Sequence, residues 1–270
     1  MLRREAPQIK SFLKRTLAAF CVTAGIPVAF GLAMHMAEDW ATRMVYGAFG
    51  WLGIVLTGMV GTPVHEAGHY LACRLFRLPV TEVALFRPVS GRSDGVLGYV
   101  TFVCDPSDRW QRLGSFFAGI APMFFGAAVI LLLVWLLTPE VWTGASSSIR
   151  GALRKSRNPL RLMGAVVSGY LKGFGTLRRF GIVRGMVSLY LICSISMHMS
   201  LSAADLQGLP EGLLLIAALC AVFSLATLLL RVDTRPGLTR AAAVFSVFFG
   251  MGLTLCLLFG LLARLAMLRF

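Results

Sequence analysis

Long apolar runs alternate with short polar stretches along this chain. Six of the runs are close to the length of about 20 residues that a helix needs to cross a bilayer. They are Leu17–Met36, Met44–Val60, Leu113–Leu137, Ile182–Ala204, Leu213–Leu230 and Ala241–Leu262. The pattern predicts an all-α polytopic membrane protein with about six transmembrane helices, in which residues 1–270 form a single membrane domain.

One stretch between the apolar runs has a different period. In residues 78–110, two β-prone runs, Val80–Phe86 and Val96–Val103, flank a turn-rich segment that ends in Asp-Gly. This pattern predicts a membrane-associated β-hairpin over residues 80–103. The exposed edge of such a hairpin can bind an extended peptide by strand addition, and a plain connecting hairpin is the alternative.

Composition and charge narrow the class of protein. Hydrophobic residues make up 57% of the chain and charged residues 14%, and the mean hydropathy is +0.77. A net charge of +14 would suggest nucleic acid in a soluble protein, but Lys and Arg beside membrane helices contact anionic lipid headgroups. We therefore expect the lipid bilayer, and no nucleic acid, as the partner of these charges. The basic residues 138–181 are predicted to form a surface segment.

The strongest chemical signal is "HEAGH" at the end of the second apolar run. His65 and His69 are four residues apart, so on a helix they lie one above the other and can bind one zinc ion. Glu66 then lies next to the site and can act as general base for a zinc-activated water. Ionisable groups at membrane depth are costly and indicate function, although a structural polar patch is the alternative.

A zinc site of this kind needs a third protein ligand. The long form of the motif is excluded, because Ala72 and Leu75 stand where its glycine and its third histidine would be. Glu82 lies in the predicted hairpin. Asp205, which follows the fourth apolar run, remains as the candidate, although by itself it could equally be a cap or turn residue.

The predicted topology supports Asp205 over a nearby histidine. With the N-terminus inside, His65 and Asp205 both lie near the inner end of a span and at similar depth. His198 is two helical turns before Asp205, about 10 Å along the axis, so both can bind one ion only if the helix unwinds between them. We expect His198 to form hydrogen bonds on the substrate side of the site or behind the metal ligands, or to be only structural.

Together these features resemble the site-2 protease family of intramembrane zinc metalloproteases. The resemblance covers residues 44–210 and rests on "HEAGH" on a membrane helix, a following hairpin, a span beginning "FFAGIAP" and an aspartate closing a later span. It implies a compact member without a PDZ domain, with a catalytic core made of the zinc-motif helix 44–76, the hairpin 80–103 and the helices 113–137 and 182–204.

The same resemblance implies roles for individual residues. His65, His69 and Asp205 would bind one Zn²⁺ per chain, and Glu66 would be the general base. The expected function is an intramembrane zinc endopeptidase that cleaves a transmembrane segment of a single-pass membrane protein. The expected location is a bacterial cytoplasmic membrane, as a multi-pass protein.

Two other functions stay open. One is a zinc-binding membrane scaffold without catalytic activity, which Glu66 argues against because binding a metal needs no base. The other is a metal or ion transporter, which would place ionisable groups along a path through several spans. In the sequence these groups gather around the histidine motif, His198 and Asp205, with His35 and Arg184 apart.

Overall fold

The computed structural model describes residues 2–155, 182–202, 205 and 209–268, together with positions 161, 164, 168 and 172. These residues are predominantly helical and include one small two-stranded sheet. The elements in chain order are α1 (Leu2–Phe20), a π-helical turn (Cys21–Gly25), α2 (Ile26–Leu75), β1 (Val80–Ala84), α3 (Gly91–Asp94), β2 (Tyr99–Phe102), α4 (Arg109–Leu137), α5 (Pro139–Lys155), α7 (Ile182–Met197), α8 (Leu209–Leu229) and α9 (Arg235–Met267). The predicted combination of apolar helices with a hairpin is confirmed at this level.

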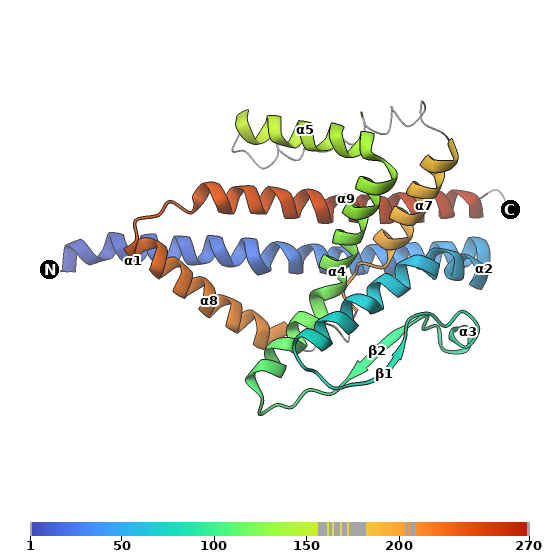
Figure 1. Cartoon of the computed structure of the whole chain (residues 1–270), viewed down its shortest axis with the longest axis horizontal. Helices are drawn as coiled ribbons and strands as arrows, with labels where there is room; N and C mark the ends of the chain where they lie inside the picture. The colour runs from blue at the N-terminus through green and yellow to red at the C-terminus, as the bar shows by residue number, and fades with distance from the viewer. Residues whose placement is uncertain are drawn as a thin grey trace.

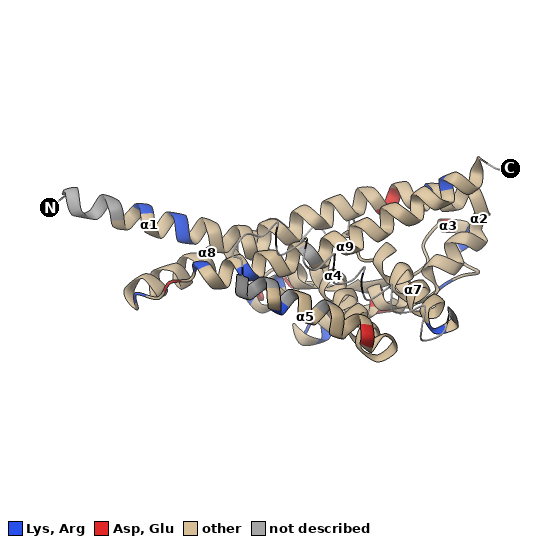
Figure 2. Cartoon of the chain, turned by 90° about the horizontal axis from the view of Figure 1, so that it is seen from above, with Lys and Arg blue, Asp and Glu red and all other residues tan. Residues whose placement is uncertain are grey.

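The described residues contain four helical segments long and apolar enough to cross a membrane, judged by length and composition. They are Gln8–Leu75, Arg109–Leu137, Pro210–Leu229 and Arg235–Met267. The predicted number of six is not confirmed, because the first two apolar runs fall within one helical segment and the fourth forms only the shorter helix Val183–Met197. Figure 2 shows how few charged residues these long helices carry along their length.

The chain bends inside α2 rather than between the first two apolar runs. The polar stretch 37–43 stays helical, and Asp39 pairs with Arg43 one turn later at 2.7 Å, a spacing that supports a helix. Gly50 instead adopts φ 61° and ψ −155°, a conformation open mainly to glycine. In Figure 1 the first part of α2 runs beside α9, and the part after Gly50 turns back toward the hairpin.

The hairpin is antiparallel and shorter than its two β-prone runs. Its register extends from Val80 opposite Phe102 to Ala84 opposite Tyr99, with an irregularity after Val80. The residues between the strands dock on the second part of α2, where the indole N–H of Trp51 donates to the Pro88 carbonyl at 2.8 Å. The hairpin is thus held against the helix that carries the histidine motif.

Around this helix, the core is formed by α4, α7 and α9. One buried cluster joins Met34 of α2 with Ile130 of α4 and with Ile195 of α7, and Val141 of α5 packs on it. The predicted basic surface segment 138–181 is described mainly through α5, and most of its remainder, residues 156–181, lies outside the described residues.

Candidate metal centre

The two motif histidines face each other on the second part of α2. Their Nε2 atoms are 2.9 Å apart, and their ring centroids are separated by 4.7 Å at an interplanar angle of 71°. His69 is buried and His65 is half-buried. The helical spacing of four residues therefore produces the shared face that the sequence predicted.

Asp205 meets these histidines from a segment distant in sequence. Its Oδ1 atom lies 3.2 Å from Nε2 of His69, and both side chains are more than nine-tenths buried. The ligand atoms of His65, His69 and Asp205 all lie within 4.8 Å of one another. The other carboxylate oxygen of Asp205 accepts the backbone N–H of Ser202 at 2.7 Å, which fixes the direction of the carboxylate.

Backbone carbonyls determine which nitrogen of each histidine carries the proton. Nδ1 of His65 lies 2.6 Å from the carbonyl oxygen of His198, and Nδ1 of His69 lies 2.8 Å from that of Ala118. A carbonyl can only accept, so each Nδ1 is the donor and each Nε2 presents a lone pair. Two lone pairs and the carboxylate of Asp205 then converge on one point, an arrangement that is repulsive unless a metal ion, or a proton on one of the Nε2 atoms, lies between them.

The donor set fits zinc. Two imidazole nitrogens and one carboxylate oxygen with an open fourth position are typical of catalytic zinc sites. At Zn–N distances of about 2.1 Å, tetrahedral ligand atoms lie roughly 3.4 Å apart. Two of the three separations here, 2.9 Å and 3.2 Å, are close to this value, and the third is within 4.8 Å. Carbonyl acceptors on the far nitrogens are the usual partners that orient histidine ligands.

The segment "AGIAP" of α4 explains two of these contacts. In a regular helix the carbonyl of Ala118 would accept the N–H of residue 122, but that residue is Pro122, which has none. The carbonyl is therefore free for His69. A Cβ atom on Gly119 would lie 2.3 Å from the backbone oxygen of Asp205, so glycine is what allows the Asp205 segment to approach α4.

A serine of α7 fixes how closely that helix approaches the motif. The Ser194 hydroxyl accepts the N–H of Gly61 at 2.9 Å and donates to the Thr57 carbonyl at 2.6 Å, so it is inserted into the hydrogen-bond ladder of α2. A Cβ on Gly61 would lie 2.2 Å from the Ser194 carbonyl oxygen. This close approach of α7 to α2 places the backbone carbonyl of His198 next to His65.

The His198 side chain lies outside the triad. Its Nδ1 lies 3.0 Å from the carbonyl oxygen of Ser194, one turn earlier. The cluster of possible ligand atoms found among the described residues contains only His65, His69 and Asp205. His198 therefore acts on the site through its backbone carbonyl.

Glu66 lies beside the triad and under the hairpin. It is 7% exposed, and it is close enough to Asp205 for the two carboxyl groups to interact electrostatically. A Cβ on Gly98, just before β2, would lie 2.9 Å from Cγ of Glu66 and 2.7 Å from Cγ2 of Thr62. Glycine thus lets the hairpin pack directly against the Glu66 side chain.

Hydrogen bonds hold the hairpin itself in shape. Asp94 accepts the N–H of Val96 at 2.9 Å and pairs with Arg87 at 3.0 Å, and these bonds hold the pKa of Asp94 below its usual value. Tyr99 donates to Glu82 at 2.5 Å, which raises the pKa of Tyr99. Glu82 is therefore occupied within the hairpin and does not belong to the metal centre.

Sequence reasoning missed one buried carboxylate near the site and misplaced one histidine. Glu38 of α2 lies close to Ser200 and interacts electrostatically with Asp205, and one of its carboxylate oxygens is buried without a hydrogen-bond partner. His35, expected to lie apart, interacts with both carboxylates. A histidine and a glutamate three residues apart on an apolar helix were the signal that could have found them.

Comparison of the chain with protein-family models, with curated proteins and with solved structures gives no match.

Proposed function

We propose that this protein is an intramembrane zinc endopeptidase of the site-2 protease type, which cleaves a transmembrane segment of a single-pass membrane protein. One observation carries the proposal: two Nε2 lone pairs and a carboxylate oxygen converge beside a buried glutamate. His65, His69 and Asp205 would hold the zinc. When bound, the ion would polarise a water molecule and the substrate carbonyl, which is the chemistry of peptide hydrolysis.

Glu66 is the residue that moves protons in this proposal. It follows His65 directly and is 7% exposed, so it is placed next to the site and largely shielded from solvent. Its carboxylate takes a proton from the attacking water and transfers it to the leaving amine, the usual role of a general base. Binding a metal for structure alone requires no such group, which favours an enzyme over a zinc-binding scaffold.

The surroundings of the site favour a substrate that lies in the membrane. The motif belongs to a helical segment long and apolar enough to cross a bilayer, and so does the segment of α4 that packs against it. A protease must locally unfold a helical substrate, because helix carbonyls are hydrogen-bonded internally. The hairpin, which lies against Glu66 through Gly98, supplies a strand edge that can hold the substrate extended.

One observation favours the alternative of ion transport. His35 and Glu38 extend the line of ionisable groups from Asp205 along α2, and such a line is what an ion path through a membrane requires. Glu66 is not needed on that line, so the two functions differ in what they require of this residue.

The test compares membrane proteins in cells that produce the wild-type protein or its Glu66→Gln variant. We expect Glu66→Gln to abolish cleavage, so that uncut single-pass proteins accumulate, while the purified variant retains its zinc. Glu211→Gln, a change at an exposed carboxylate of α8, is the matched control and should behave as the wild type. Identical membrane proteomes for the wild type and Glu66→Gln would refute the proposal.

A further inference from the structure

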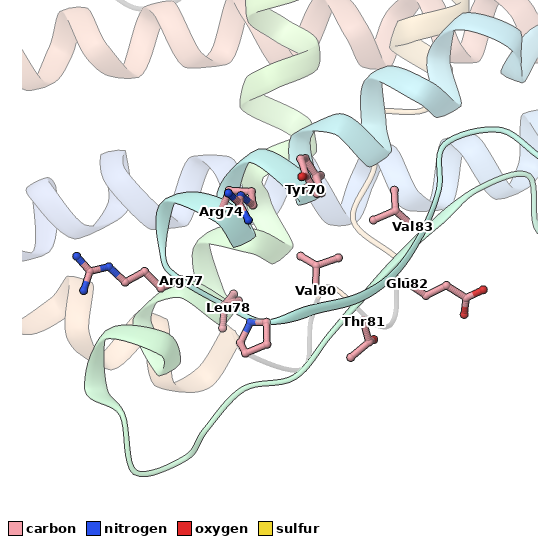
Figure 3. A pocket seen from close by; sticks show the side chains of 9 residues that line it. Tyr70, Arg74, Arg77, Leu78, Val80, Thr81, Glu82 and Val83 are labelled. Atoms are coloured by element: carbon pink, nitrogen blue, oxygen red, sulfur yellow. The ribbon is translucent and has the colours of Figure 1, made fainter.

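An open hollow of about 660 Å³ lies between the C-terminal end of α2 and strand β1. Tyr70 and Arg74 line it from the helix, Arg77 from the following turn, and Val80 and Val83 from the strand. Figure 3 shows Val80 and Val83 pointing from the strand toward the helix, with Tyr70 and Arg74 on the helix side. One wall is therefore apolar, and Arg74 and Arg77 belong to the lining at one end, where the Arg77 side chain extends away from the strand in Figure 3.

These two arginines have no acidic partner in the part of the chain that the structure describes. Both are exposed, and none of the ion pairs between described residues includes Arg74 or Arg77. The nearby carboxylate of Glu82 accepts a hydrogen bond from Tyr99, and in Figure 3 it extends away from Arg77. The charge at this end of the hollow is thus left for a ligand.

The end of α2 fixes where the backbone of Arg77 lies. α2 ends in a Schellman motif, in which the Leu78 N–H donates to the Cys73 carbonyl at 2.9 Å and the Arg77 N–H donates to the Arg74 carbonyl at 3.4 Å. Residue 77 has φ 59°, a left-handed conformation in which glycine is favoured. Arg231 has the same conformation, φ 55°, at the end of α8, so the backbone places Arg77 beside the hollow without by itself assigning it a function.

The hollow lies close to the metal centre along the chain. Tyr70 directly follows His69, and Arg74 is one helical turn further, about 6 Å along the axis. An extended peptide advances about 3.3 Å per residue. A peptide on the unpaired edge of β1 would therefore bring a side chain roughly two to four residues from the site of cleavage to the two arginines.

We propose that this hollow binds an extended segment of the substrate and selects one with an acidic side chain, which pairs with Arg74 and Arg77. The identity of the peptide as a substrate rests on the proposed function, but its binding does not. Strand β1 has β2 as its one partner in the described sheet, so its other edge can pair with the peptide backbone. An anionic lipid headgroup would use the arginines but not this edge.

The experiment measures peptide binding without cleavage. The full chain with the Glu66→Gln substitution is placed in phosphatidylcholine nanodiscs, and fluorescence anisotropy follows two short labelled peptides of valine, threonine and serine. One peptide carries a single Glu, and the other carries Gln at the same position. We expect the Glu peptide to bind about threefold to tenfold more tightly at low salt, and this preference to fall as salt rises.

Substitutions of the arginines then test the assignment. Arg77→Gly relieves the strain at residue 77 while removing the charge, and Arg74→Gln removes the other charge; each should reduce the preference for the Glu peptide. Arg74→Glu should reverse it in favour of a peptide with Lys at that position. Arg92→Gln, at an exposed arginine of α3, is the matched control and should keep the wild-type preference.

Each outcome supports or overturns the proposal. Equal binding of the Glu and Gln peptides overturns it, as does an unchanged preference in Arg74→Glu. A parallel measurement follows phosphatidylglycerol that copurifies with each variant from mixed-lipid nanodiscs. If the arginine variants lose this lipid with no change in peptide binding, the residues bind lipid and the proposal is also overturned. Selective peptide binding in a protein that shows no cleavage would refute the proposed function and leave this inference standing.

Discussion

The Nδ1–H of His69 donates to the backbone carbonyl of Ala118 at 2.8 Å. This carbonyl is available because Pro122, four residues later, has no N–H to offer it. A single proline in one apolar helix thus determines the direction in which a histidine of another helix presents its second nitrogen.

Replacing that proline should loosen the metal site. In Pro122→Ala the new N–H competes with His69 for the Ala118 carbonyl, so the imidazole loses part of its orientation. We expect zinc affinity to fall by about 10- to 100-fold, the usual effect of changing a group that orients a ligand. Pro236→Ala is the control, because a proline in the first turn of α9 replaces no intrahelical donor. Competition with a zinc-binding dye measures the zinc affinity of both variants. Equal affinities of Pro122→Ala and the wild type would contradict this role of Pro122.

The two motif histidines should each be required for zinc. We expect the purified protein to contain about one zinc per chain and His65→Ala and His69→Ala to contain almost none, because two ligands remain in each variant. His35→Ala, a change at a histidine that interacts with Asp205 but does not belong to the cluster of ligand atoms, should retain the metal. Elemental analysis after gel filtration measures the zinc content per chain. Full zinc content in both motif variants would rule out the site.

The third ligand should be Asp205 and not His198. Asp205→Asn removes the carboxylate charge from the triad, so we expect zinc affinity to fall by more than the about 100-fold seen for orienting groups and cleavage to be lost. His198→Ala should keep zinc, because the bond to His65 comes from the backbone carbonyl of residue 198. Zinc content and proteolysis are measured side by side. Zinc retained in Asp205→Asn and lost in His198→Ala would instead identify His198 as the third ligand.

The contact between the hairpin and Glu66 should be sensitive to one methyl group. In Gly98→Ala the new Cβ would lie 2.7 Å from Cγ2 of Thr62 and 2.9 Å from the Leu85 carbonyl oxygen, so the hairpin must shift. A displacement near 1 Å beside a catalytic group can lower the rate on the order of a hundredfold. We expect cleavage to fall and zinc to be retained.

Gly151→Ala is the control for this effect, since a Cβ at Gly151 meets nothing within 4 Å. Cleavage by Gly98→Ala at the wild-type rate would show that the hairpin position does not affect Glu66. Loss of zinc in Gly98→Ala would instead show that the shift reaches His65 and His69.

Local patterns in the sequence determined the helical class, the hairpin and the face shared by His65 and His69. Each of these depends on a period of 3.6 or 2 residues, which is read from neighbouring positions. The same reasoning counted Leu17–Met36 and Met44–Val60 as two transmembrane helices, separated at residues 37–43. This stretch is helical in the structure, with Asp39 and Arg43 paired one turn apart, and the bend lies at Gly50 instead.

Only the tertiary structure decided how the site is completed. The approach of Asp205 to His69, the free carbonyl of Ala118 and the placement of Glu38 beside Ser200 all join segments distant in sequence. Such contacts depend on how closely helices pack, and this is set by which residues lack a side chain or an N–H at the crossing point. Gly119 and Pro122 can be read from the sequence, but the segments that contact them cannot. Those segments depend on the packing of the whole chain.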